Sequence, residues 1–228
     1  CNTLSKYKIE ILATDSTTKH IKNLGFSCNN ISKFIKHKEM LGGRVKTLHP
    51  SIHASLLFKR NSNEHCKEFN SLKFPNIEFL FVNLYPFEKY SNKFIDSNKS
   101  IEMIDIGGVS LLRSAAKNFN FVTVVSSAND YSKFISNISK NKGVTTLNFR
   151  KKMAIKVFKK TSLYDLKVYN WLTKNKSKKI NLDDFEKQDL KYGENPHQEA
   201  QFYKEITKKT FNEHLILENK KLSYNNIL

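Results

Sequence analysis

Apolar positions along the chain follow two periods, and each period predicts one kind of element. Nearly continuous apolar runs at 77–83 and 121–126 are typical of strands that are buried on both faces. Shorter apolar runs predict strands at 8–13 and 26–31. Apolar residues at helical spacing predict helices at 18–24, 63–72, 100–104, 109–117, 131–139 and 146–172, the last as one long helix or two.

Strands and helices therefore alternate over most of the chain. This alternation predicts an α/β protein whose mainly parallel sheet is covered by helices on both faces. We expect this first domain to span 1–172, followed by a linker over 173–189 that begins with a lysine-rich, unpatterned segment. The rest, 190–228, is too short for a domain of ordinary size. Because the chain begins with Cys1 rather than Met and stops at Leu228 without a terminating pattern, we expect both ends to be cut.

The segment Gly42–Pro50 (GGRVKTLHP) has the composition of an anion-binding loop. Two glycines permit sharp turns, and Arg44, Lys46 and Thr47 supply two cations and a hydroxyl. In open α/β sheets, ligands bind beyond the carboxyl ends of the strands. That rule selects three further loops, at 14–17, 83–87 and 105–108.

Each of these loops also has a purely structural interpretation. Hydroxyls at Ser16 and Thr17 are suited to cap the following helix. Asn83 can satisfy turn amides, and Asp105 can stabilise a helix N-terminus without any chemistry. Lys117 is favourable near a helix C-terminus for the same electrostatic reason. Only the conjunction of these loops favours a binding site.

The formal net charge of +18 is typical of proteins that bind nucleic acid or acidic substrates. The basic residues are nevertheless scattered among abundant Lys, Asn, Ile and Phe, without a run of five or six like charges. We therefore favour biased composition over a nucleic-acid partner.

Metal, disulfide and membrane functions have little support in the sequence. Cys1, Cys28 and Cys66 form no CxxC pair, and His49 and His53 have no evident third ligand. No GxGxxG, GxxxxGK[ST] or GxSxG motif occurs. No apolar run approaches the roughly 20 residues that span a bilayer. We expect a cytoplasmic protein with no metal site.

Four longer motifs occur in one order along the chain. They are Gly42–Pro50, 83–87 (NLYPF), 104–109 (IDIGGV) and 111–118 (LLRSAAKN). Together they resemble the IMP cyclohydrolase domain of the bifunctional purine-biosynthesis protein that also carries AICAR transformylase. Residues 192–198 (YGENPHQ) and 222–228 (LSYNNIL) resemble the opening of that family's transformylase domain.

The resemblance implies a methylglyoxal-synthase-like fold and a defined reaction. The formylated aminoimidazole carboxamide ribotide would close to IMP with loss of water. The catalytic residues implied are Lys46, Tyr85, Asp105 and Lys117. The substrate contacts implied are Thr14, Thr17, Arg44, Thr47, Asn83, Ile106 and Gly107, with second-domain ribotide contacts at Lys191 and Tyr192. Ring closure needs no cofactor, whereas the transformylase half would use 10-formyltetrahydrofolate. The implied partners are a phosphorylated ribonucleotide and a second copy in a homodimer.

The chain departs from the family pattern at three places. Nothing before Lys6 matches the usual first phosphate-binding loop. The usual Ser-Thr-Gly-Gly-Thr loop reads Ala13–Thr17, where Asp15 would repel a phosphate if it faced inward. Lys191 replaces an arginine and cannot grip phosphate at two points. These departures keep an alternative open, namely a nucleotide-binding module or an inactive fragment without turnover.

The spacing within the implied catalytic set raises a geometric question. Asp105 and Lys117 are twelve residues apart, which is roughly 18 Å along a helix. A lysine side chain recovers only part of that distance. We therefore expect either a bend at the Gly107-Gly108 pair or a site that a second subunit completes.

Overall fold

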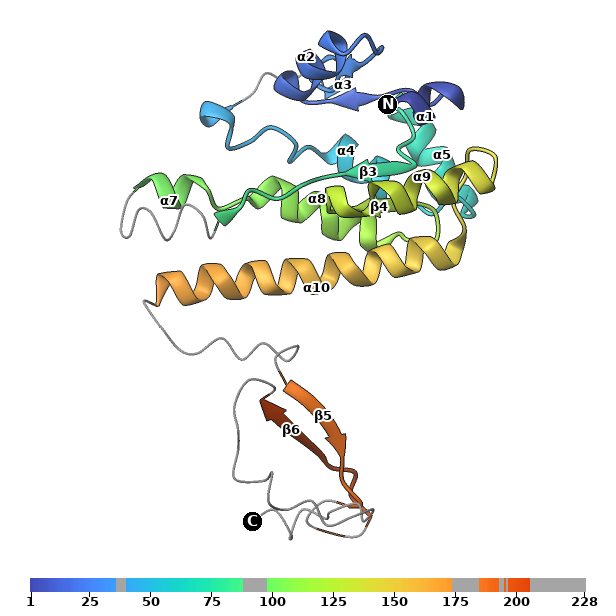
Figure 1. Ribbon diagram of the computed structural model, residues 1–228. Coiled ribbons are helices and arrows are strands. Elements are labelled where there is room, and N and C mark those ends of the chain that lie inside the picture. The colour runs from blue at the N-terminus through green and yellow to red at the C-terminus, as the bar shows by residue number, and fades with distance from the viewer. Residues whose placement is uncertain (36–39, 88–97, 174–184, 193–194, 196, 206–228) are drawn as a thin grey trace. The chain divides into compact units, whose positions relative to one another are not determined.

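The computed structural model describes residues 1–35, 40–87, 98–173, 185–192, 195 and 197–205 (Figure 1). It divides into two compact units, 1–175 and 176–228. The elements of the first unit are α1 (Asn2–Lys6), β1 (Leu12–Ala13), α2 (Asp15–Asn23), β2 (Asn29–Asn30), α3 (Ser32–Ile35), η1 (Leu41–Gly43), α4 (Pro50–Leu57), α5 (Asn63–Ser71), β3 (Phe79–Phe81), α7 (Asn98–Glu102), α8 (Ile106–Lys117), β4 (Thr123–Val125), η2 (Ala128–Asp130), α9 (Tyr131–Lys140) and α10 (Leu147–Leu172).

The centre of the first unit is the parallel pair β3 and β4, in which Phe79 lies opposite Thr123 and Phe81 opposite Val125. Side chains alternate across this pair because successive strand residues point to opposite faces. On one face, the rings of Phe79 and Phe81 meet Phe134 of α9 at centroid distances of 5.3 and 5.0 Å. The edge-to-face geometry of both contacts fixes α9 over this side of the strands.

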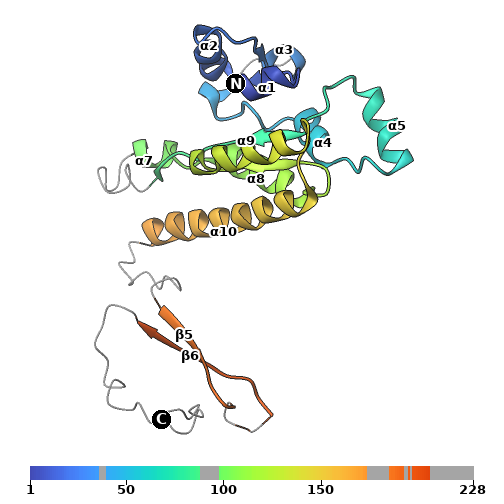
Figure 2. The same cartoon turned by 45° about the vertical axis from the view of Figure 1, so that its right-hand side comes forward.

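On the other face, α8 and α10 run side by side and α4 packs against α8 (Figure 1 and Figure 2). The core here consists of buried side chains from α4 (Ile52, Leu56), α8 (Leu111, Leu112, Ala115, Ala116), β4 (Val124) and α10 (Met153, Ala154, Val157). Helices therefore cover both faces of the strands. The predicted α/β class, with parallel strands between helices, is confirmed.

Several elements differ from the sequence prediction at their ends. The strands are shorter than the apolar runs, and β1 pairs with β2 in a ladder separate from β3 and β4 among the described residues. Helix α4 was not predicted, although Pro50 is well suited to the first helical position, where its missing N–H costs nothing. Helix α7 begins at Asn98, before the predicted start at Ser100, which is buried inside the helix. The long apolar pattern after 146 forms one helix, α10.

The described part of the second unit contains an antiparallel hairpin of β5 (Phe185–Asp189) and β6 (Gln201–Glu205). Strand β5 lies within the range predicted as a linker. The motif that resembles the transformylase opening begins three residues after β5 and partly lies outside the described residues, as does the run at 222–228.

Candidate functional site

Asp105 is the N-cap of α8, and its carboxylate binds two backbone amides. Oδ1 accepts a hydrogen bond from Gly108 N–H at 2.7 Å, and the carboxylate also accepts one from the backbone of Tyr85. A Cβ at position 108 would lie only 2.5 Å from Oδ2, so this close approach requires glycine. The capping interpretation of Asp105 is therefore confirmed. The second bond also ties the loop after β3 to the start of α8.

The environment of this carboxyl changes its acidity. Burial raises the pKa of Asp105 above its ordinary value, and the N–H bonds from Gly108 and Tyr85 only partly oppose that effect. A carboxyl that keeps its proton to a higher pH is better matched to proton transfer near neutrality. Asp105 is thus both a structural cap and a candidate acid or base.

The predicted anion loop also reaches the start of α8. Thr47 Oγ1 lies 2.9 Å from where a Cβ would sit on Gly107. A larger residue at 107 would therefore displace the threonine hydroxyl. Lys46, next to Thr47, is half-buried. Three predicted loops, with Thr47, Tyr85 and Asp105, consequently meet at one helix end.

Arg44, from the same predicted loop, forms an ion pair with Glu102 of α7. Its Nη2 binds one carboxylate oxygen, and its Nε binds the other at 3.2 Å. The hydrogen bond and the charge of Glu102 raise the pKa of Arg44, and the same hydrogen bond lowers the pKa of Glu102. Both side chains are at least half exposed. Two nitrogens of the Arg44 guanidinium, which was predicted to hold phosphate, are thus bound to the Glu102 carboxylate.

The remaining residues near the strand ends are more open to solvent. The Tyr85 side chain is 62% exposed and Ile106 is 58% exposed. Asn83 Nδ2 donates to the Tyr131 hydroxyl at 3.2 Å, so this amide is oriented by α9 rather than by turn amides. A phenol, an amide and an apolar side chain therefore remain accessible to a ligand.

Lys117 lies at the opposite end of α8 from Asp105. The helix is continuous from Ile106 to Lys117, so the expected bend at the Gly107-Gly108 pair is wrong. The glycines fit within the first turn because the cap at Asp105 holds the helix start. About 18 Å of helix therefore separates the two ends, and one chain does not bring both side chains to the same place.

The other predicted contacts lie elsewhere. Thr14 precedes α2 as its N-cap residue, without a side-chain capping bond, and Thr17 is exposed on the first turn. Among the described residues, no hydrogen bond joins either threonine to Arg44. Asp15 accepts a hydrogen bond from Asn30 of β2. Lys191 and Tyr192 belong to the second unit, so nothing places them at this site.

Sequence reasoning missed Tyr164 of α10 and Glu102 of α7, both of which contact predicted site residues. The Tyr164 hydroxyl accepts a hydrogen bond from Asp105 N–H at 2.7 Å. Its only signal in the sequence is a phenol on the buried face of a helix, in the same row as Val157 and Thr161. Glu102 carries no signal, because its partner Arg44 is far away in sequence.

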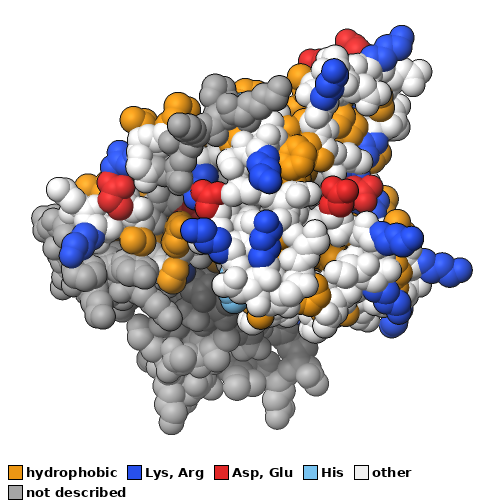
Figure 3. Space-filling view, turned by 90° about the horizontal axis from the view of Figure 1, so that it is seen from above, with side chains coloured by type: hydrophobic (Ala, Val, Ile, Leu, Met, Phe, Trp, Pro, Cys, Tyr) orange, Lys and Arg blue, Asp and Glu red, His pale blue; other side chains and the backbone are white. Residues whose placement is uncertain are grey.

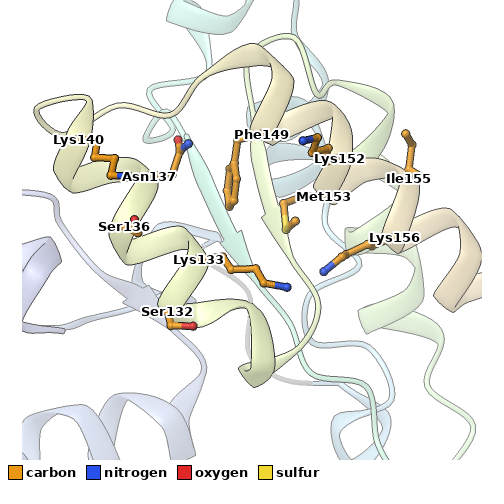
Figure 4. Close-up of a pocket in the computed structure, with 10 residues that line it drawn as sticks. All are labelled: Ser132, Lys133, Ser136, Asn137, Lys140, Phe149, Lys152, Met153, Ile155 and Lys156. Atoms are coloured by element: carbon orange, nitrogen blue, oxygen red, sulfur yellow. The ribbon is translucent and has the colours of Figure 1, made fainter.

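A separate hollow of about 680 Å³ lies between α9 and α10 (Figure 4). Lys133 and Lys156 reach toward each other there, and both pair with Asp130, at 3.5 and 2.5 Å. No predicted site residue lines it. On the face shown in Figure 3, Lys and Arg side chains are dispersed, with acidic side chains between them. The hollow and the predicted chemistry therefore lie in different places.

Two further findings concern the described residues only. They include no group of three or more His, Cys, Asp or Glu side chains placed to hold a metal ion. They also include no helix with the length and apolar character needed to cross a membrane.

Comparison with known proteins first identifies the class of domain. Residues 1–110 match the model of the MGS-like domain, in agreement with parallel strands between helices. Residues 115–228 match the AICARFT/IMPCHase bienzyme model. The chain therefore belongs to the AICARFT/IMPCHase bienzyme family.

Individual relatives agree with this assignment. The bifunctional purine biosynthesis protein PurH of Bradyrhizobium diazoefficiens is 39% identical, over 98% of this chain and 43% of the relative. PurH of Lactobacillus acidophilus is 42% identical, over 96% of this chain and 44% of the relative. The crystal structure of ForH matches with a TM-score of 0.63 and 26% identity, over 75% of this chain and 89% of that one. The chain thus spans less than half the length of these two PurH relatives.

Proposed function

We propose that this chain is an IMP cyclohydrolase, which closes the formylated aminoimidazole carboxamide ribotide to IMP in purine biosynthesis. One observation carries the proposal: the loops of Thr47, Tyr85 and Asp105 meet at the start of α8. Membership of the bienzyme family and the PurH relatives support the same reaction. The first unit holds all the residues concerned.

The reaction forms a bond between the carboxamide nitrogen and the formyl carbon. The carboxamide nitrogen loses a proton, and the formyl oxygen becomes an oxyanion and is protonated to a hydroxyl. The hydroxyl then leaves as water with a second proton, which the formamide nitrogen gives up as the C=N bond of the new ring forms. Such a step needs a proton acceptor near the amide and donors near the oxyanion. We assign proton transfer to Asp105 and Lys117, and stabilisation of the oxyanion to Lys46 and Tyr85. No step requires a metal or an organic cofactor.

The substrate is held by its phosphate and by its base. Arg44 and Thr47, with Thr14 and Thr17, would hold the 5′-phosphate, and Arg44 would first release Glu102. Asn83, Ile106 and Gly107 would receive the base, the last two through their backbone. The helix start adds free N–H groups and a favourable dipole for negative charge.

Lys117 enters this scheme from a second copy of the chain. Ile106, Arg113 and Lys117 follow one face of α8 at helical spacing. Arg113 lies over the ring of Phe158 at 5.7 Å, which joins this face to exposed apolar residues of α10. These exposed residues are Ile155, Phe158, Leu166 and Tyr169. A twofold axis near the middle of α8 would place the partner's Lys117 beside Asp105.

The second unit would begin the transformylase domain. Lys191 and Tyr192 would contact the ribotide there, and 10-formyltetrahydrofolate would serve only that reaction. We assign no formyl transfer to the described residues.

The test of the cyclohydrolase is IMP formation from the formylated ribotide, measured by absorbance. Lys46→Ala and Asp105→Asn should each lower turnover by roughly 100-fold or more while circular dichroism shows an intact fold. Lys67→Ala on the exposed face of α5 serves as the control. Ligand binding without turnover in the wild type would instead indicate a binding module.

Mixed subunits test the shared site. Asp105→Asn and Lys117→Ala chains are each inactive alone, but a mixed dimer contains one site with both residues intact. Co-refolding the two variants should therefore restore turnover. If both residues of a site come from one chain, mixing restores nothing.

A further inference from the structure

Tyr164 of α10 lies next to the proposed site without facing the solvent. Its side chain is buried, at 7% exposed. The hydroxyl accepts a hydrogen bond from Asp105 N–H at 2.7 Å and donates one to Met103 C=O at 3.3 Å. One phenol therefore satisfies two backbone groups of the turn that leads into α8.

The ring of Tyr164 has a second contact, with the loop that carries Tyr85. Phe87 is 2% exposed and meets the Tyr164 ring at a centroid distance of 6.2 Å and the Trp171 ring at 5.6 Å. Phe87 N–H also donates to Tyr85 C=O at 2.8 Å, which makes this loop compact. Helix α10 thus contacts the Tyr85 loop through the ring of Tyr164 and the turn before α8 through the hydroxyl of the same residue.

We propose that Tyr164 is a positioning residue that fixes the Asp105 carboxylate relative to the Tyr85 loop. This inference rests on the proposed cyclohydrolase function. Tyr164 acts through Asp105 and has no contact of its own with the reacting atoms in the scheme above. A misplacement of about 1 Å costs up to roughly 100-fold in rate, so such a support matters for turnover.

Removal of the hydroxyl would leave Asp105 N–H and Met103 C=O without their partner. The turn would then relax, and the carboxylate would lose the bond from Tyr85 and gain contact with water. Burial is the largest effect on the pKa of the Tyr164 phenol and raises it. The bond from the Asp105 backbone lowers this pKa, and the negative charges of Asp105 and of Asp165 on α10 raise it. Loss of the Tyr85 bond raises the pKa of Asp105, and better hydration lowers it. Because burial is the largest cause of the raised pKa, we expect a net fall toward the ordinary carboxyl value.

The test compares Tyr164→Phe with Tyr203→Phe, a control tyrosine on β6 that is 41% exposed and has no part in the proposed site or subunit contact. For Tyr164→Phe we expect kcat to fall about tenfold or more with KM changed less than about threefold, since the binding residues are untouched. We also expect the Asp105 carboxyl, followed by carbon NMR, to titrate at lower pH than in the wild type. Tyr203→Phe should change neither quantity.

The outcomes separate this inference from the function on which it rests. An inactive wild type overturns the cyclohydrolase, and the NMR titration still decides the role of Tyr164. Unchanged kcat and an unchanged Asp105 titration in Tyr164→Phe overturn the inference. If that variant does not fold, hydrogen exchange of the wild type decides: slow exchange of the Asp105 amide supports the contact, and exchange as fast as an exposed amide overturns it.

Discussion

Replacing Asp105 separates its structural role from its chemical role. Asp105→Ala removes the acceptor for Gly108 N–H and Tyr85 N–H together, whereas Asp105→Asn keeps one side-chain oxygen at the same place. Asn is about as good an N-cap as Asp. The two variants therefore differ in helix capping and agree in lacking a titratable carboxyl.

The stability change follows from the lost acceptor. Loss of an N-cap costs about 0.5–2 kcal/mol, and a second unpaired amide adds on the order of 1 kcal/mol, so we expect about 2 kcal/mol for Asp105→Ala. For a chain of this size that corresponds to a melting temperature lower by roughly 4–8 °C. Asp105→Asn should melt close to the wild type. Both should lose roughly 100- to 10,000-fold in turnover, which is the usual contribution of acid–base catalysis.

The pH dependence adds a signed test. Because burial raises the folded-state pKa of Asp105, the folded protein binds this proton more readily than the unfolded chain does. Wild-type stability therefore falls as the pH rises through the range between the two pKa values. Asp105→Asn should gain relative to the wild type over that range, in thermal melts by circular dichroism. Equal losses of stability in Asn and Ala, or full turnover in Asn, would refute this reasoning.

Three further predictions concern the surroundings of the site and the core. Glu102→Gln should free Arg44 and lower KM in steady-state kinetics; an unchanged KM contradicts a role for Arg44 in phosphate binding. Gly107→Ala should push Thr47 aside and raise KM with little change in melting temperature, because its Cβ meets only the end of a side chain at 2.9 Å. Leu112→Ala, at a fully buried position of α8, should cost about 2–5 kcal/mol in urea unfolding. Its control Leu147→Ala, at an exposed position, should stay within about 0.5 kcal/mol of the wild type, and equal losses would contradict the core assignment.

The fold class was predictable because its signal is local. Continuous apolar runs mark β3 and β4, and helical spacing marks α8, α9 and α10. The ends of the elements were less predictable, since a two-residue strand such as β1 is defined by its partner and not by its own residues. Helix α4 was missed because Pro50 was interpreted as the end of a loop rather than as a helix start.

The candidate site was predicted only where its signal is local. The motifs identified Thr47, Tyr85 and Asp105, but not the packing that joins them. Tyr164 is distant in sequence and looks like any buried aromatic residue until its hydroxyl is seen on the Asp105 amide. The position of Lys117 depends on whether α8 is straight. The Gly107-Gly108 pair made a bend plausible from the sequence, but the helix is continuous.

The pairing of Arg44 with Glu102 has a consequence for turnover. Substrate and product of the proposed reaction carry the same phosphate, so a stronger grip on it would slow the departure of IMP as much as it favoured the arrival of its precursor. If Arg44 holds that phosphate as proposed, the Glu102 carboxylate that competes for it would weaken both complexes by the same factor. The proposed enzyme would then release IMP sooner, with the chemistry at the base unchanged.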